Sequence, residues 1–240
     1  MTHLTNNDIE EIYNKHVKPL HTNEYMNKYH PFENHIHKNN KNWKWENKDF
    51  PRVISLLEFG DIITKYNFSI DKLLTFNGSE DPELEYLCNR YKQLLNIDYD
   101  NTANHDLHTL KLKHNGFDFV LLNQTLEHLY NPFACLENIN KHMCMNGYLY
   151  INAPACNVPH SDPYHFYTGF SLTGLLCIGK LSGFKILEAG QWGNTDYLVK
   201  LWTRNPGWSD YQQINNPGKN ELQNPVIVWC LLQKEQEIIK

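Results

Sequence analysis

Several features that commonly identify a function are scarce in this sequence of 240 residues. No apolar run approaches the ~20 residues that a helix needs to cross a bilayer, and the polar N-terminus, MTHLTNNDIEEIYNK, lacks the apolar segment of a signal peptide. Positive charge is not in excess, because the net charge is −5. Binding of a nucleic-acid backbone normally needs a clustered cationic surface. We therefore expect neither a membrane nor a nucleic acid as the main partner.

The cysteines are too scattered to suggest a framework. Most of the six lie among apolar residues. Disulfides and zinc frameworks usually show regular cysteine spacing, so we expect reduced core thiols in a cytoplasmic protein.

The first 50 residues differ in composition from the rest and are rich in Asn, His, Lys and aromatic residues. Asn7–Asp8 is a candidate cap for a helix that ends near Lys18. The remainder up to residue 50 has neither helical nor strand periodicity. We predict an N-terminal arm over residues 1–50 and a single folded domain over residues 51–240, which opens with an amphipathic helix up to Tyr66.

Strand and helix patterns alternate after residue 70. Strands are predicted at 72–76, 93–97, 117–123 and 148–154, and helices at 81–91 and 132–143. The runs FVLL and LYI are continuously apolar, which is typical of strands that are buried on both faces. This rhythm predicts an α/β fold with a doubly wound, mostly parallel sheet and helices on both faces. A helix at 170–184, a strand from Phe184, a loop at 204–224 and a last strand at 224–234 complete the expected domain.

Ligands of such sheets bind at the carboxyl ends of the strands. A glycine-rich loop is missing there: the first strand is followed only by Asn77-Gly78-Ser79, directly after Thr75 and Phe76. Asn tolerates a left-handed backbone, so this stretch still predicts a tight turn. Asp98 follows the second strand at the distance at which an acid accepts hydrogen bonds from two ribose hydroxyls.

Four further residues are expected along the same groove. Asp106 and Leu107 are candidates to flank an adenine, and Asn123-Gln124 follows the third strand.

The segment FDFVLLNQTLEHLYNPFACLENINKHMCMNGYLYINAP resembles the central part of class I S-adenosylmethionine-dependent methyltransferases. Later segments, PYHFYTGFSLTGLLCIGKLSGFKILEAG and NPVIVWCLLQK, resemble the end of the same family. The resemblance covers about Leu73 to Lys234. It implies a seven-stranded Rossmann-like sheet and S-adenosylmethionine as the cofactor. It also implies that Asp98 binds the ribose, that residues around Asp106 contact the adenine, and that Asn123-Gln124 lies beside the methionine portion.

The first strand departs from the family pattern. Thr75 stands where the family has an acid, and we expect Glu80 or Asp81 to substitute for it. S-adenosylmethionine has no phosphate to bind, so a loop with few glycines remains compatible with it. The alternative is a methyltransferase-like domain that has lost catalysis and serves as a binding or scaffold protein.

The candidate catalytic residues are expected on the side of the groove where the methyl acceptor would bind. His128 follows the third strand, and the loop PHSDPYHFYTG after the fourth contains His160, Asp162 and His165. These four are the candidate catalytic residues, because imidazole accepts protons near neutral pH. We assign no metal, although His160, Asp162 and His165 are suitable ligand types. The other interpretation is a capping loop whose side chains bond only to the backbone.

The sequence therefore predicts transfer of a methyl group to an oxygen or nitrogen of a small molecule. A sugar or nucleotide-linked sugar is favoured by general similarity to enzymes of glycan modification.

Overall fold

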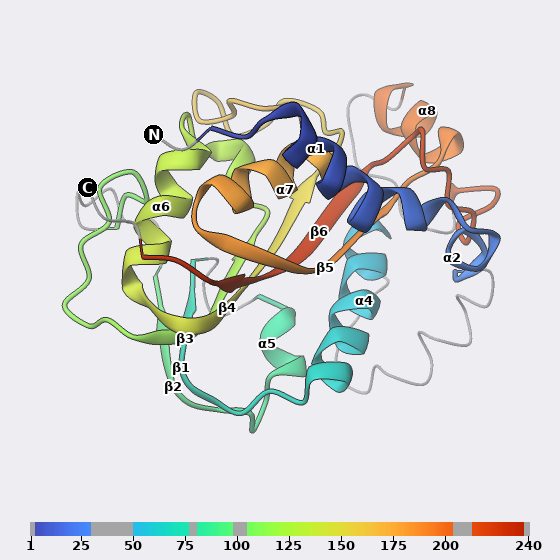
Figure 1. Cartoon of the computed structure of the whole chain (residues 1–240). Helices are drawn as coiled ribbons and strands as arrows, with labels where there is room; N and C mark the ends of the chain where they lie inside the picture. The colour runs from blue at the N-terminus through green and yellow to red at the C-terminus, as the bar shows by residue number, and fades with distance from the viewer. Residues whose placement is uncertain (1–2, 30–49, 77–80, 98–104, 204–212, 238–240) are drawn as a thin grey trace.

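The computed structural model describes residues 3–29, 50–76, 81–97, 105–203 and 213–237. Its centre is a six-stranded sheet of order β2-β1-β3-β4-β6-β5 (Figure 1). The strands β2 (Tyr91–Asn96), β1 (Ile70–Thr75), β3 (Phe117–Asn123) and β4 (Met143–Pro154) run parallel. The strand β6 (Ile227–Lys234) is antiparallel to β4 and to β5 (Phe184–Trp192). The predicted doubly wound α/β class is confirmed, with six strands in the described ranges where seven were expected.

Helices cover both faces of the sheet. Alternate residues of each strand contribute their side chains to the hydrophobic core on one face or the other. Val120 and Leu122 pack into one cluster with residues of α1 (Asn6–Ile12), α6 (Pro132–His142) and α7 (Leu172–Leu181). Phe119 and Leu121 pack into a second cluster with α4 (Phe50–Tyr66) and α8 (Thr195–Thr203) (Figure 1). Successive strand side chains point to opposite faces, so a continuous apolar run serves both layers.

Local sequence signals explain where the helices of the second half begin. The Asn131 side chain accepts a hydrogen bond from the backbone N–H of Ala134 and caps α6, which starts with Pro132. The Ser171 side chain caps α7 in the same way through the N–H of Gly174. Gly183, with φ +84°, follows α7 in the left-handed conformation that glycine adopts most easily.

Three local predictions need correction. Thr5, rather than Asn7–Asp8, caps α1, because the Thr5 and Asp8 side chains form a reciprocal capping box. The helix predicted at 81–91 is reduced to α5 (Glu83–Tyr86), and Asn89 beyond it has a left-handed φ of +65°. The helix α8 was not predicted; it is capped by the Asn194 side chain, which accepts from the N–H of Tyr197.

The N-terminal segment packs against the domain. After α1 the chain continues as a π-helical turn at Tyr13–Val17, a 3-10 turn at Lys18–His21, and α2 (Asn23–Asn27). The hydroxyl of Tyr25 donates to the carbonyl of Gln191 at 2.7 Å and accepts from the N–H of Gln191 at 2.8 Å. Gln191 belongs to β5, the edge strand, so Tyr25 satisfies backbone groups that an edge leaves unpaired.

Among the described helices, none is long and apolar enough to cross a membrane.

We predict that Tyr25→Phe lowers the free energy of unfolding by about 1–3 kcal/mol. The variant leaves the buried Gln191 N–H without the Tyr25 oxygen, and the Gln191 carbonyl keeps only its bond from Asn220. Urea denaturation measures this change. Tyr13→Phe is the matched control, since Tyr13 is 40% exposed. Equal stability of the two variants would show that the Tyr25 hydroxyl contributes nothing to the docking of this segment.

Candidate functional site

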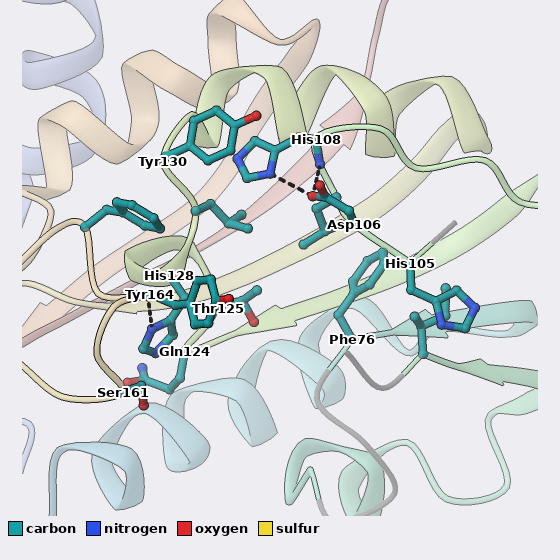
Figure 2. A pocket seen from close by; sticks show the side chains of 14 residues that line it. Phe76, His105, Asp106, His108, Gln124, Thr125, His128, Tyr130, Ser161 and Tyr164 are labelled. Atoms are coloured by element: carbon teal, nitrogen blue, oxygen red, sulfur yellow. Dashed lines mark hydrogen bonds and ion pairs between the residues drawn. The ribbon is translucent and has the colours of Figure 1, made fainter. Parts of the chain in front are cut away.

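A cavity of about 470 Å³ opens at the carboxyl ends of β1, β2 and β3 (Figure 2). Phe76 follows β1, Ile97 follows β2, and Gln124 and Thr125 follow β3. Parallel strands end at the same edge of a sheet, which is why these residues meet. The full lining is Phe76, Ile97, His105, Asp106, Leu107, His108, Gln124, Thr125, His128, Leu129, Tyr130, Ser161, Tyr164 and Phe166.

One wall is a compact polar and aromatic unit. An Asp106 carboxylate oxygen accepts from the backbone N–H of His108 at 2.9 Å and lies 2.7 Å from His108 Nδ1. The His108 ring stacks on Tyr130, with ring centroids 3.7 Å apart and planes inclined by 9° (Figure 2). The segment before β3 is thereby joined to the segment after it.

Gln124 is held at the end of β3 by contacts with β4. Its backbone is left-handed, with φ +47°, and its N–H donates to the carbonyl of Asn152 at 2.8 Å. Its side-chain amide donates to Asn152 Oδ1. The Thr125 hydroxyl donates to the carbonyl of Asn123 at 2.8 Å, which stabilises the same turn.

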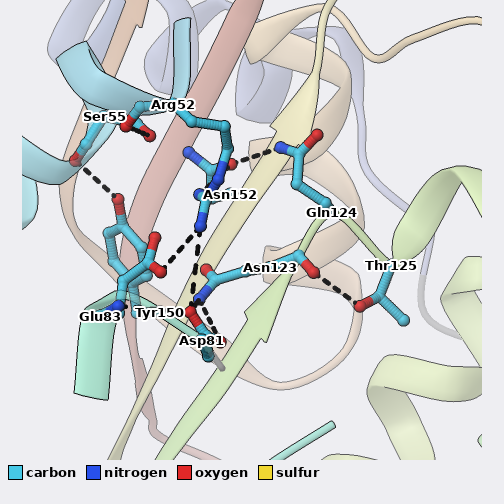
Figure 3. Close-up of polar contacts among 9 residues, drawn as sticks. All are labelled: Arg52, Ser55, Asp81, Glu83, Asn123, Gln124, Thr125, Tyr150 and Asn152. Atoms are coloured by element: carbon cyan, nitrogen blue, oxygen red, sulfur yellow. Dashed lines mark hydrogen bonds and ion pairs between the residues drawn. The ribbon is translucent and has the colours of Figure 1, made fainter. Parts of the chain in front are cut away.

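A buried polar network underlies this turn (Figure 3). Arg52 of α4 donates to Asn152 Oδ1 at 2.9 Å and to Glu83 Oε2 at 2.8 Å. The Asn123 amide donates to the two carboxylate oxygens of Asp81 at 3.1 and 2.9 Å, and Arg52 lies 3.9 Å from Asp81. Burial raises the pKa of Glu83, and the Arg52 guanidinium opposes this rise. The network couples α4 and α5 to the ends of β3 and β4.

One rim of the cavity is formed by the segment after β3 and the loop after β4. The backbone carbonyl of Glu127 accepts from the N–H groups of Phe166 and Tyr167 at 2.8 and 3.2 Å. His128 Nδ1 lies 2.8 Å from the carbonyl of Tyr164. Burial raises the pKa of the Glu127 carboxyl to about 7. The two segments therefore form one docked unit.

Three histidines gather at this rim. The ring centroids of His128 and His160 are 4.9 Å apart, those of His128 and His165 are 5.6 Å apart, and those of His160 and His165 are 4.6 Å apart. Burial lowers the pKa of His165, and the His160 and His128 rings lower it further. Burial also lowers the pKa of His128.

The predicted cofactor residues fall into three groups. Asp106, Leu107 and Gln124 line the cavity. Thr75 and Asn123 are fully buried outside its lining, and the Asn123 side chain faces Asp81 instead. The remaining ones, Asn77, Gly78, Ser79 and Asp98, lie outside the described residues, as does Glu80. The Asp81 carboxylate is engaged by Asn123 and does not line the cavity.

The predicted catalytic residues are brought together only in part. His128 lines the cavity, and His160 and His165 contact its ring without lining the cavity themselves. Asp162 is exposed on the same loop, and its charge raises the pKa of His165 against the larger effects of burial and the two neighbouring rings.

Several lining residues were missed by sequence reasoning. Phe76 and Ile97 directly follow their strands, so strand ends alone were a sufficient signal for them. His108 and Tyr130 gave no such signal, because their pairing joins two segments separated by β3.

Comparison with known proteins identifies the domain. Residues 81–151 match the family described as "Methyltransferase domain". The chain therefore carries a methyltransferase domain in this segment. S-adenosylmethionine is the cofactor of this family. No curated protein sequence matches the chain.

Solved structures of low sequence identity share the fold. An S-adenosylmethionine-dependent methyltransferase from Clostridium acetobutylicum ATCC 824 is 10% identical, with a TM-score of 0.52, and 88% of this chain and 100% of that one are covered. The [4+2]-cyclase SpnF is 14% identical, with a TM-score of 0.50 and coverage of 81% and 85%. A protein of Bacillus halodurans C-125 provisionally named a methyltransferase is 9% identical, with a TM-score of 0.50 and coverage of 75% and 99%.

The residues that line the cavity fit S-adenosylmethionine. The cavity volume lies within the range of about 300–1,000 Å³ that small-molecule sites occupy. Phe76, Ile97 and Leu107 offer apolar surface for a purine, whereas Asp106 and Gln124 offer polar groups at separate points of the lining. A ligand with an aromatic base at one end and an amino acid at the other needs this distribution.

We predict that Arg52→Met destabilises the fold by about 3–5 kcal/mol, because Glu83 then remains buried without its cation. Urea denaturation measures the loss. The double variant Arg52→Met/Glu83→Gln removes both charges and should be more stable than the single variant. If the double variant is less stable than Arg52→Met, the ion pair is not the source of the effect.

Proposed function

We propose that this protein transfers a methyl group from S-adenosylmethionine to an oxygen or nitrogen of a small molecule, with a sugar or nucleotide-linked sugar as the favoured acceptor. The observation that carries the proposal is the position of the cavity. It lies at the carboxyl ends of β1, β2 and β3 and has a histidine cluster at one rim. A cofactor site and a reactive rim thus adjoin each other.

The proposed cofactor contacts follow the chain order. Asp98 accepts hydrogen bonds from the ribose hydroxyls, Asp106 and Leu107 flank the adenine, and Gln124 lies beside the methionine portion. The turn at Asn77, Gly78 and Ser79 approaches the cofactor, and Thr75 and Asn123 support the ends of their strands from within the core. Support for this assignment comes from the cavity lining at residues 76, 97, 106, 107 and 124.

Methyl transfer demands little covalent help from the protein. The sulfonium of the bound cofactor supplies an electrophilic methyl group. The chain has to align the acceptor, exclude water and remove a proton from a neutral acceptor, and alignment alone can contribute several kcal/mol, up to about 7–11. His128 is placed for the proton step because it lines the cavity, and His160, His165 and Asp162 surround it on the neighbouring loop.

The preference for a sugar is supported by aromatic side chains at the histidine rim. Tyr130, Tyr164 and Phe166 line the cavity and are 60%, 54% and 44% exposed. Exposed aromatic faces offer apolar surface beside a polar tip, which suits a sugar ring with its alternating C–H and hydroxyl groups. A cytoplasmic location is supported by the six cysteines, all of which are free.

We predict that Asp98→Ala weakens S-adenosylmethionine binding by about 100-fold, because two hydrogen bonds to a charged acceptor are lost. Isothermal titration calorimetry measures the affinity, and circular dichroism verifies the fold. Asp71→Ala is the matched control, since Asp71 pairs with Lys92 on the surface. Unchanged affinity of Asp98→Ala would reject the ribose role. Absence of binding by the wild-type chain at millimolar cofactor would favour the scaffold alternative.

We predict that His128→Ala and His165→Ala each lower kcat by about 100-fold or more, since general base catalysis contributes 10²–10⁴-fold, while cofactor affinity changes little. The assay follows formation of S-adenosylhomocysteine with a panel of sugars and nucleotide-linked sugars. His114→Ala is the control, because His114 is exposed and away from the cavity lining. Normal turnover by both variants would exclude both histidines from the proton step.

A further inference from the structure

The three histidines at the cavity rim are close enough together to act as a group of metal ligands as well as in proton transfer. Each of His128, His160 and His165 offers one ring nitrogen, and these three nitrogens all lie within 4.8 Å of one another. They come from two separate segments, the 3-10 turn Leu126–His128 after β3 and the loop after β4. Within the described ranges this is the group of histidine, cysteine and acidic side chains that converges closely enough to hold a metal ion.

Backbone hydrogen bonds set the tautomers of two of these rings. His128 Nδ1 lies 2.8 Å from the carbonyl of Tyr164, and His160 Nδ1 lies 2.9 Å from the carbonyl of Val158. A carbonyl only accepts, so each Nδ1 carries the proton in these contacts and the lone pair of each neutral ring is on Nε2. Metal-binding histidines characteristically donate their second N–H to a backbone carbonyl or carboxylate in this way.

The third ring, His165, has two nitrogens that are shielded from solvent and have no hydrogen-bond partner among the described residues. A shielded polar group without a partner costs free energy, and a bound cation would satisfy it. A carboxyl group is also close, because Glu127 Oε1 lies 3.9 Å from His128 Nε2.

We propose that His128, His160 and His165 together bind one divalent transition-metal ion, with Zn²⁺ as the first candidate, and leave a coordination position open toward the cavity. Three imidazoles favour Zn²⁺, Co²⁺, Ni²⁺ or Cu²⁺ over Mg²⁺ and Ca²⁺, which prefer oxygen ligands. Three protein ligands with an open fourth position are characteristic of catalytic rather than structural zinc sites.

The geometry requires only a small contraction. Nitrogen ligands about 2.0–2.1 Å from a tetrahedral Zn²⁺ lie about 3.3 Å from each other. The present spread of up to 4.8 Å therefore has to shrink by at most about 1.5 Å. Rotation of the His165 ring can supply much of this, since no hydrogen bond to the described residues holds it.

This site differs from the sequence expectation, which considered His160, Asp162 and His165 and assigned no metal. His128 takes the place of Asp162 because the docking of Phe166 and Tyr167 onto the Glu127 carbonyl brings the loop to the end of β3. The metal site itself is inferred independently of the proposed function, and only the role of the cation in catalysis rests on that function. Bound there, the cation polarises an acceptor oxygen or nitrogen at its open position, and the histidines act as ligands instead of as the base.

Metal binding can be tested without cofactor or acceptor, so its outcome is separate from that of the methyltransferase assays. The full chain, with any affinity tag removed, is treated with a chelator, dialysed and titrated with ZnCl₂ by calorimetry. We expect one Zn²⁺ per chain, no competition by millimolar Mg²⁺, and a visible absorption band of tetrahedral character when CoCl₂ replaces zinc.

Single variants locate the site. His128→Gln, His160→Gln and His165→Gln should each weaken Zn²⁺ binding by about 100-fold, since even outer partners of ligands cost 10–100-fold, and each should remove the cobalt band. His114→Gln is the matched control and should bind as the wild type does. A thermal shift on addition of Zn²⁺ should likewise occur in the wild type and in His114→Gln but not in His165→Gln.

Two results would overturn the proposal. One is a wild-type chain that shows neither calorimetric binding of Zn²⁺ nor a cobalt band. The other is zinc binding that the three cluster variants retain and that the double variant His35→Gln/His37→Gln abolishes, because the ion would then be held by the N-terminal arm.

Discussion

The shared direction and register of β2, β1, β3 and β4 is the constraint from which the site follows. Thr75 pairs with Asn96 on one side and with Leu121 on the other, and Asn123 pairs with Asn152. These pairings bring the next residues of each strand to one edge of the sheet. The register is itself determined by burial on both faces, since a shift by one residue would exchange the side chains of the two cores.

This edge contains buried polar groups that need hydrogen-bond or ion-pair partners within the protein interior. Arg52, from a helix that precedes the sheet, reaches Glu83 and Asn152, and through Asn152 it is connected to Gln124. Removing charges from water is costly, so such a network is stable only when its partners are well placed. The same residues that complete the core at this edge thus also orient Gln124 toward the cavity. Thr75, the last residue of β1, is fully buried at the same edge.

The fold alone leaves the chemistry open. The solved structures that share it include a methyltransferase and a [4+2]-cyclase. The chemical groups of this chain gather in the unit at the rim, where His128, His160 and His165 meet beside exposed aromatic side chains. Its assembly depends on a loop that docks onto the backbone of Glu127. The histidine rim and the cavity are therefore joined through the end of β3.

The sequence by itself determined the elements whose signals are local. Continuous apolar runs gave the strands, and the helices expected at 132–143 and 170–184 formed as α6 and α7. The residues after the third strand gave Gln124 and His128, and the connection before it gave Asp106 and Leu107, all of which line the cavity. It overestimated α5 and missed α8, because a helix that short or that dependent on tertiary packing has a weak periodic signal. The tertiary structure alone decided that Asn123 faces Arg52's network, that His108 stacks on Tyr130, and that His128 joins His160 and His165. These are contacts between residues far apart in the chain, whose distances depend on how whole segments pack and leave no periodicity in the sequence.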